Sequence, residues 1–325
     1  MIRHEIVLKG RELPIKATRF GYGEGLVVLG DRHDNVLVLG GDLTGSTAAS
    51  LFKEAYPGRF YSIGIAEQNM AAVAGGLSLT GKIPFISTYC VFSAGRAWDQ
   101  VRTTIAYTPL NVKIGGAHSG VSVGPDGATH QGLEDIATMR CIPNMTVNAP
   151  CDAIETRKAT IAIGEMAGPA YIRFGREPVP VITGEDTPYN FGEAIMFRDG
   201  TDCIVFACGY MVYRSLVAAE ELEEEGLSVG VVNLHTVKPI DEDAIVECAR
   251  RAGCLVTAEE HQVMGGMGSA VAEVVVRKAP VPMEFIGVLD RFGESGRPEE
   301  LMDEFNLGIG DVKEAVKRAV SRKGF

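Results

Sequence analysis

Short apolar runs alternate with longer segments of mixed composition along the first half of the chain. The runs are rich in β-branched residues and are flanked by Gly or Pro, which predicts buried strands. The predicted strands are Val36–Leu39, Ile83–Ser87, Val112–Gly115, Met145–Asn148 and Ala170–Arg173, and the predicted helices lie near residues 66–80, 94–107, 133–140 and 152–166. Near-continuous apolar strands indicate a parallel sheet covered on both faces. The pattern therefore predicts a doubly wound α/β domain.

Residues 176–192 interrupt this alternation with three prolines and little periodicity, which is typical of a connection between domains. The alternation then resumes. The second set of predicted strands is Cys203–Ala207, Val229–Asn233, Cys254–Ala258 and Met283–Ile286, and the predicted helices are Val212–Glu225, Asp241–Arg251, Ser269–Arg277 and about Asp311–Arg322. We predict an α/β protein of two doubly wound domains with mainly parallel sheets, residues 1–180 and 193–325, joined by a linker at 181–192.

Composition and charge narrow the classes of function. The chain has 325 residues, and its 31 basic and 42 acidic residues give a formal net charge of −11, which argues against a nucleic-acid partner. No N-terminal signal is visible and no apolar run approaches the ~18 residues that span a bilayer, so we expect a cytoplasmic protein with no membrane partner. The seven cysteines form no CxxC pair and are expected to be free thiols.

Glu67 stands at the start of a predicted helix of small residues, in the stretch GIAEQNM. Small residues allow close packing, so we expect this helix to be buried, and a buried carboxylate needs a partner. Glu67 either stabilises the positive end of the helix dipole or shares a proton with a ligand nitrogen.

Tyr89 and Phe92 follow the predicted strand at 83–87, and the carboxyl ends of parallel strands are where open α/β sheets bind ligands. These aromatic rings either belong to the core or stack on a heterocycle.

The stretch from His118 to Gln131 is a Gly-rich loop that holds two of the six histidines, with Asp126 between them and His130 near its end. This composition favours polyol or phosphate recognition and proton transfer over a plain connection. A metal site is disfavoured, because the histidines are twelve residues apart and nothing completes a ligand set. Arginine side chains suit phosphate, although single arginines are more often surface charges. The candidates are Arg19, Arg173 and Arg176.

Taken together, these segments resemble the C-terminal half of transketolase. The resemblance rests on GIAEQNM at Glu67, on GKIPFISTY, on HSGVSVGPDGATHQGLEDIATMR and on EEHQVMGGMGSAVAE at 259–273, and it covers nearly the whole chain. It implies a pyrimidine-binding domain followed by the family's C-terminal domain. The family's Gly-Asp-Gly motif for the cofactor diphosphate is not found, so the chain resembles one subunit of a split transketolase.

This resemblance implies thiamine diphosphate as cofactor, with Mg or Ca bound mainly by a partner N-terminal subunit and no metal ligand in this chain. It also implies sugar phosphates as substrates, and a heterotetramer in which this chain also pairs with itself. The expected reaction is the transfer of a two-carbon ketol unit from a ketose phosphate to an aldose phosphate.

The cofactor residues follow from the same resemblance. Glu67 matches the glutamate that hydrogen-bonds the aminopyrimidine ring and promotes the imino tautomer, whose nitrogen removes the thiazolium proton. Tyr89 matches the aromatic residue that stacks on this ring, Phe92 lines the same pocket, and Asp42 matches an acid near the cofactor. Where many members have a third aromatic residue this chain has Gly95.

The resemblance also assigns the substrate residues. His130 matches a catalytic histidine near the ketose carbonyl, and Asp126 matches an acid that bonds a substrate hydroxyl. The expected phosphate ligands are His118, Arg19, Ser46 and Arg176, with Arg173 as an alternative to Arg176.

Three other interpretations stay open. A deoxyxylulose-phosphate synthase shares the Glu and the DG-x-THQ loop but usually carries Arg at the position of His118. The beta subunit of a 2-oxo acid dehydrogenase keeps the Glu but lacks the pattern from Asp126 to His130. A non-catalytic regulatory subunit would be expected to lose Glu67, Asp126 or His130, and all three are present.

Overall fold

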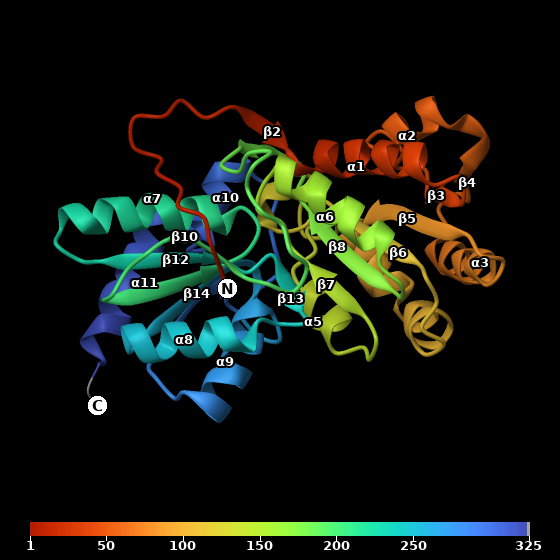
Figure 1. Ribbon diagram of the computed structural model, residues 1–325. Coiled ribbons are helices and arrows are strands. Elements are labelled where there is room, and N and C mark those ends of the chain that lie inside the picture. Colours follow the sequence, from red (N-terminus) through yellow and green to blue (C-terminus); the bar gives the residue numbers. More distant parts are fainter. Residues whose placement is uncertain (324–325) are drawn as a thin grey trace.

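Two twisted β-sheets, each covered by helices on both faces, make up the structure (Figure 1). The computed structural model describes residues 1–323. The first sheet has, in spatial order, β13 (Thr236–Lys238), β7 (Thr146–Asn148), β8 (Ala170–Phe174), β6 (Lys113–Ala117), β5 (Ile83–Tyr89), β3 (Val36–Gly40) and β4 (Phe60–Ser62). The second has β1 (Ile2–Arg3), β10 (Ile195–Arg198), β12 (Val229–Asn233), β11 (Cys203–Ala207), β14 (Leu255–Gln262) and β15 (Met283–Val288). The short strands β2 (Ile15–Ala17) and β9 (Pro178–Pro180) form an antiparallel pair.

The predicted fold class is confirmed. The central strands of both sheets pair in parallel, and only β10–β12 and β13–β7 are antiparallel pairs within them. In the first domain the helical elements are α1 (Thr18–Arg32), α2 (Ser50–Ala55), η1 (Pro57–Arg59), α3 (Glu67–Leu79), η2 (Phe92–Arg96), α4 (Trp98–Gln100), η3 (Val101–Ala106), η4 (Val121–Asp126), α5 (Asp135–Arg140) and α6 (Ala153–Glu165). In the second they are α7 (Met211–Glu224), α8 (Glu242–Ala252), α9 (Met267–Lys278), α10 (Pro298–Glu304) and α11 (Ile309–Ser321).

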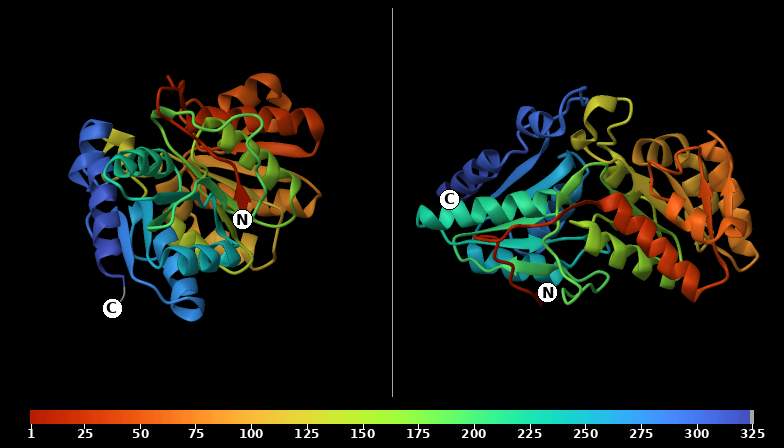
Figure 2. Two further views of the ribbon diagram at one scale, coloured as in Figure 1. Left: turned by 60° about the vertical axis from the view of Figure 1, so that its left-hand side comes forward. Right: turned by 90° about the horizontal axis from the view of Figure 1, so that it is seen from above.

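The two domains exchange edge strands. β1, at the start of the chain, pairs with β10 in the second sheet, and β13, from the second half, pairs with β7 in the first. Figure 2 shows the N-terminal segment crossing from α1 to the second domain. One apolar cluster also runs through both domains, because Ile86 and Ile114 of the first sheet belong to the same core as Ile245 of α8. The division at 181–192 stays a prediction, and the exchanged strands show that each sheet needs residues from both halves.

Helix α1 was not predicted, because its glycines lower the helical signal of its sequence. The glycines let α1 pack closely on α6: a Cβ on Gly21 would lie 2.0 Å from the carbonyl oxygen of Ala153. The predicted helix at 94–107 is instead a run of π-helical turns around the single α-turn α4. The helix at Glu67 is buried on one face only, and Leu79 at its end is 72% exposed.

All seven cysteines are free, as expected, and all but Cys141 are buried. Between residues 1 and 323, no helix is both long enough and apolar enough to cross a bilayer.

The close contact between α1 and α6 predicts opposite effects for two Gly-to-Ala changes. Gly21→Ala should lower the free energy of unfolding by about 1–3 kcal/mol, because the added methyl group meets backbone that cannot move aside. Gly76→Ala, in α3, meets nothing within 4 Å and should raise it by about 0.4–1 kcal/mol. Urea unfolding of the two variants measures both values. Equal effects at the two positions would contradict this account of the α1–α6 contact.

Candidate active site

Four loops of the first domain meet at the carboxyl edge of its sheet, where β3, β5, β6 and β8 end side by side. Asp42 follows β3, Tyr89 ends β5, His118 follows β6 and Arg176 follows β8. Parallel strands all point their carboxyl ends to one edge, so residues distant in sequence converge there. The edge therefore collects most of the residues that the sequence singled out.

Tyr89 lies at the centre of an aromatic cluster. Its ring stacks on His118 with centroids 3.9 Å apart and on Phe92 at 5.7 Å. The ring of His130 meets Tyr89 and Phe92 edge-on, at 5.9 and 5.5 Å. The two aromatic residues and both histidines of the loop thus form one wall, as expected if they line a common pocket.

Glu67 lies in the first turn of α3 and is buried, with 3% of its surface exposed. Its carboxylate accepts hydrogen bonds from Arg96 at 3.2 and 3.3 Å. The Arg96 guanidinium also lies 4.1 Å from the centre of the Phe92 ring. The partner that a buried carboxylate requires is therefore Arg96, which the sequence analysis missed. Its spacing of four residues after Phe92, one helical turn, is the signal that could have revealed it.

The side chains of Arg19, Arg176 and His118 lie on the other side of the aromatic cluster. Arg19 donates from one terminal nitrogen to the carbonyl oxygen of Ser46 at 3.2 Å, and its buried Nε has no partner. Arg176 donates to the carbonyl oxygen of Val123 at 2.7 Å. The Nδ1 of His118 is buried and also lacks a partner. Arginine is suited to bind an anion. Here the Nε of Arg19 has no protein partner, whereas Arg176 also contacts the carboxylates of Asp126 and Glu177.

His118 is held neutral by its surroundings. Burial, together with the nearby Arg19, Arg176 and His130, lowers its pKa to about 3. A neutral imidazole between cations can accept or donate one hydrogen bond without adding repulsion. His118 also has a positive φ of 57°, a backbone conformation that side chains adopt rarely.

The geometry favours Arg176 over Arg173 as an anion ligand. Arg173 is 5% exposed, and its Nε donates to Asp135 at 2.9 Å. Its terminal nitrogens donate to the carbonyl oxygens of Glu260 and Gly132. Burial would lower the pKa of Arg173, but Asp135 raises it above its ordinary value. The nitrogens of Arg173 thus donate to groups inside the protein and do not face an anion site.

The remaining predicted residues lie at the same edge with different partners. Asp126 forms an ion pair with Arg176 at 3.4 Å, and Asp42 accepts a hydrogen bond from Ser62 at 2.8 Å. The carbonyl oxygen of Ser46, rather than its hydroxyl, meets Arg19. Among residues 1–323, no three or more His, Cys, Asp or Glu side chains group to hold a metal ion.

Comparisons with known proteins show the family of the chain. The family described as "Transketolase, pyrimidine binding domain" matches residues 16–181, and "Transketolase, C-terminal domain" matches residues 192–312. The chain belongs to the transketolase family. A putative transketolase C-terminal section from Methanocaldococcus jannaschii is 43% identical over 95% of this chain and 98% of its own length.

Two further relatives are described as a subunit or as a split-gene product. A 6-deoxy-6-sulfo-D-fructose transketolase subunit from Clostridium sp. strain MSTE9 is 40% identical over 94% of each chain. A solved structure titled "Split gene transketolase, inactive beta4 tetramer" is 46% identical, with a TM-score of 0.89 over 94% of this chain and 99% of that one. In this family the chain therefore corresponds to the pyrimidine-binding and C-terminal domains.

The neutral state of His118 predicts a pH effect on stability. In the unfolded chain this imidazole takes up a proton near pH 6.5, whereas the folded chain does so only near pH 3. Stability must therefore fall as the pH drops below 6.5. Between pH 6.5 and 5 the protonation of His118 in the unfolded chain lowers the free energy of unfolding by up to about 2 kcal/mol.

Urea unfolding at pH 7 and pH 5 measures this effect. His118→Asn should lose less stability on acidification than the unchanged chain, because the residue that takes up the proton is gone. An equal loss in both proteins would show that His118 is not held neutral.

Proposed function

We propose that this chain is the C-terminal subunit of a thiamine-diphosphate-dependent transketolase that transfers a two-carbon ketol unit from a ketose phosphate to an aldose phosphate. The observation that carries the proposal is the convergence of Glu67, the rings of Tyr89 and Phe92, and the nitrogens around His118 at one sheet edge. A buried acid beside aromatic rings suits a protonatable heterocycle, and the basic group next to it suits an anionic sugar.

The residues present fit the pyrimidine half of the cofactor. Glu67 would hold a shared proton with a ring nitrogen, and Tyr89 and Phe92 would form the apolar wall beside the ring. The buried hydroxyl of Thr88, which precedes Tyr89, has no partner in the protein. When bound, thiamine diphosphate supplies the nucleophilic carbon that carries the two-carbon unit. Asp42 lies on the loop after β3 at the same edge.

The substrate residues would contact different groups of the sugar. Arg19, Arg176 and His118 would bind the terminal anion, and the backbone around Ser46 would shape that end. Asp126 would accept a hydrogen bond from a substrate hydroxyl, and His130 would hold or move a proton near the ketose carbonyl. The subunit from Clostridium carries a sulfonated sugar in its name, and a sulfonate is a tetrahedral anion like a phosphate.

The proposal requires a second chain. A diphosphate and its Mg or Ca ion need ligands that we assign to an N-terminal subunit, since no metal-binding group lies within residues 1–323. The relative that was solved as a tetramer of this kind of subunit is described as inactive, which supports a need for the partner. We propose an assembly of two chains of each kind.

Mixing this chain with its N-terminal partner tests the proposal. With thiamine diphosphate, Mg²⁺, xylulose 5-phosphate and ribose 5-phosphate, we expect sedoheptulose 7-phosphate from the mixture and none from either chain alone. Failure with these sugars, in a mixture that turns over pyruvate with an aldose phosphate, would favour the synthase. Oxidative decarboxylation of a 2-oxo acid would favour the dehydrogenase, and a mixture that does neither would favour a regulatory subunit.

Glu67→Gln should reduce ketol transfer by at least about a hundredfold in the assembled enzyme, because the amide cannot share a proton with the cofactor nitrogen. Arg96→Gln is the matched control, because it breaks the same ion pair but leaves the carboxyl group. Both variants should keep the circular dichroism spectrum of the unchanged chain. Turnover by Glu67→Gln at a level near that of the unchanged enzyme would exclude the proposed role.

A further inference from the structure

The loop that carries His118, Asp126 and His130 is held from outside by the second domain. Its first anchor is Glu260 on β14, whose carboxylate accepts a hydrogen bond from the backbone amide of Ser122 at 2.6 Å. Gly120 makes room for this contact, because a Cβ there would lie 2.1 Å from the carboxylate oxygen of Glu260. The carboxylate of Glu260 thus supplies the hydrogen-bond acceptor that the loop itself does not provide for the Ser122 amide.

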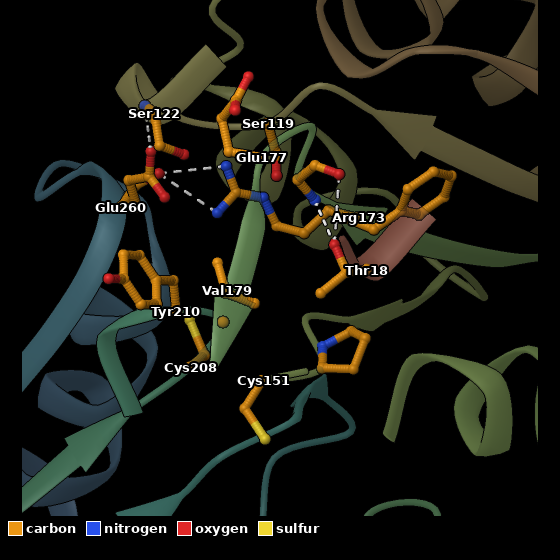
Figure 3. Close-up of a pocket in the computed structure, with 14 residues that line it drawn as sticks. Thr18, Ser119, Ser122, Cys151, Arg173, Glu177, Val179, Cys208, Tyr210 and Glu260 are labelled. Atoms are coloured by element: carbon orange, nitrogen blue, oxygen red, sulfur yellow. Dashed lines mark hydrogen bonds between the residues drawn. The ribbon is translucent and has the colours of Figure 1, made fainter. Parts of the chain in front are cut away.

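The electrostatics of Glu260 agree with this contact. Burial raises the pKa of its carboxyl group, and the amide of Ser122, Arg173 and Arg214 act in the opposite direction. Arg173 also donates to the backbone oxygen of the same residue, at 3.2 and 3.3 Å. Glu260 is therefore fixed at its backbone and directed by its carboxylate to the loop (Figure 3).

Gln131 provides the second anchor at the other end of the loop. Its side-chain nitrogen donates to the carbonyl oxygens of Val121 and Gly124, which lie inside the loop, at 3.1 and 3.2 Å. The same nitrogen donates to the carbonyl oxygen of Glu294, in the second domain, at 2.8 Å, so two of the three acceptors share one of its two hydrogens. The side-chain amide of Gln131 therefore contacts two positions inside the loop and one position in the second domain.

A cavity lies beside these contacts, but a ligand bound in it does not explain the position of Glu260. It lies between the domains, and its walls include Ser122, Arg173, Tyr210 and Glu260 (Figure 3). Its volume of about 30 Å³ is enough for two or three ordered waters, each of which needs about 10–15 Å³, and too small for a sugar. Glu260 therefore contacts the loop and not a second ligand.

We propose that Glu260 and Gln131 are positioning residues, and that the second domain sets the geometry of the substrate loop through them. Only the expected effect on enzyme kinetics rests on the proposed function, and the contacts that hold the loop do not. Loss of the Glu260 carboxylate should free the amide of Ser122 and let the loop shift. A shift of about 1 Å in groups that position a substrate can cost up to a hundredfold in turnover.

Glu259 offers a matched control on the same strand. It is also buried, and its carboxylate accepts hydrogen bonds from the amides of Met267 and Gly268 at 2.7 and 2.8 Å, at the start of α9. Removing it should destabilise the second domain without freeing the loop. Comparing Glu260→Ala with Glu259→Ala therefore separates loop positioning from general loss of stability.

Hydrogen–deuterium exchange on the full chain is the first measurement. In Glu260→Ala the peptide spanning residues 118–131 should exchange at least about tenfold faster, because the Ser122 amide loses its acceptor. Glu260→Gln keeps an acceptor oxygen and should restore protection, and Glu259→Ala should leave this peptide unchanged. The same exchange in Glu260→Ala and the unchanged chain would overturn the proposal.

Kinetics of the assembled two-chain enzyme are the second measurement. Glu260→Ala should raise the KM for the ketose phosphate by about tenfold and leave thiamine diphosphate affinity unchanged. An equal KM for Glu260→Ala and Glu259→Ala would overturn the kinetic part of the proposal. If the unchanged mixture has no ketol transfer, the proposed function fails, and the exchange data still decide whether Glu260 holds the loop.

Discussion

The arrangement of both domains depends on the ion pair and the hydrogen bonds of the buried Arg173 guanidinium. A buried charge is tolerated only when a counter-charge and hydrogen-bond partners surround it. Asp135 supplies the charge, and the hydroxyl of Tyr171 donates to the same Asp135 oxygen at 2.7 Å. The carbonyl oxygens of Gly132 and Glu260 supply the rest. Arg173 lies in β8, Asp135 in α5, Glu260 in β14, and Gly132 directly after the loop of residues 118–131. The contacts of one side chain therefore hold four parts of the chain together.

The exchanged strands extend this dependence to the whole chain. β1 and β13 each complete the sheet of the other half, and a single apolar core continues from α3 to α8 and α9. Separating the halves would expose that core and leave two sheet edges unpaired, which is costly. The second domain is therefore part of the scaffold that shapes the active-site edge, and contacts such as that of Glu260 can hold a loop of the first domain firmly.

Periodicity was enough to predict the parallel sheets, whose strand ends share one edge. The gathering of Tyr89, Phe92, His118 and His130 was expected from the resemblance to transketolase. Neither the periodicity nor the resemblance could predict contacts that depend on close packing. Helix α1 owes its place to glycines that make its sequence look unlike a helix. The choice between Arg173 and Arg176 turns on which of the two is buried, and that is decided by Asp135 and by a strand from the second domain.

The ion pair between Glu67 and Arg96 explains how the chain can fold with the carboxylate of the proposed cofactor site already buried. A carboxylate buried without a partner would cost several kcal/mol, and a chain that relied on cofactor or partner subunit to offset this cost would be unstable before assembly. Here the compensating charge comes from the same domain, and Arg96 remains 53% exposed. The acid is thus already buried and oriented while its partner stays at the surface. A ring nitrogen that enters the pocket would meet Glu67 in place, and only the exposed Arg96 would have to adjust.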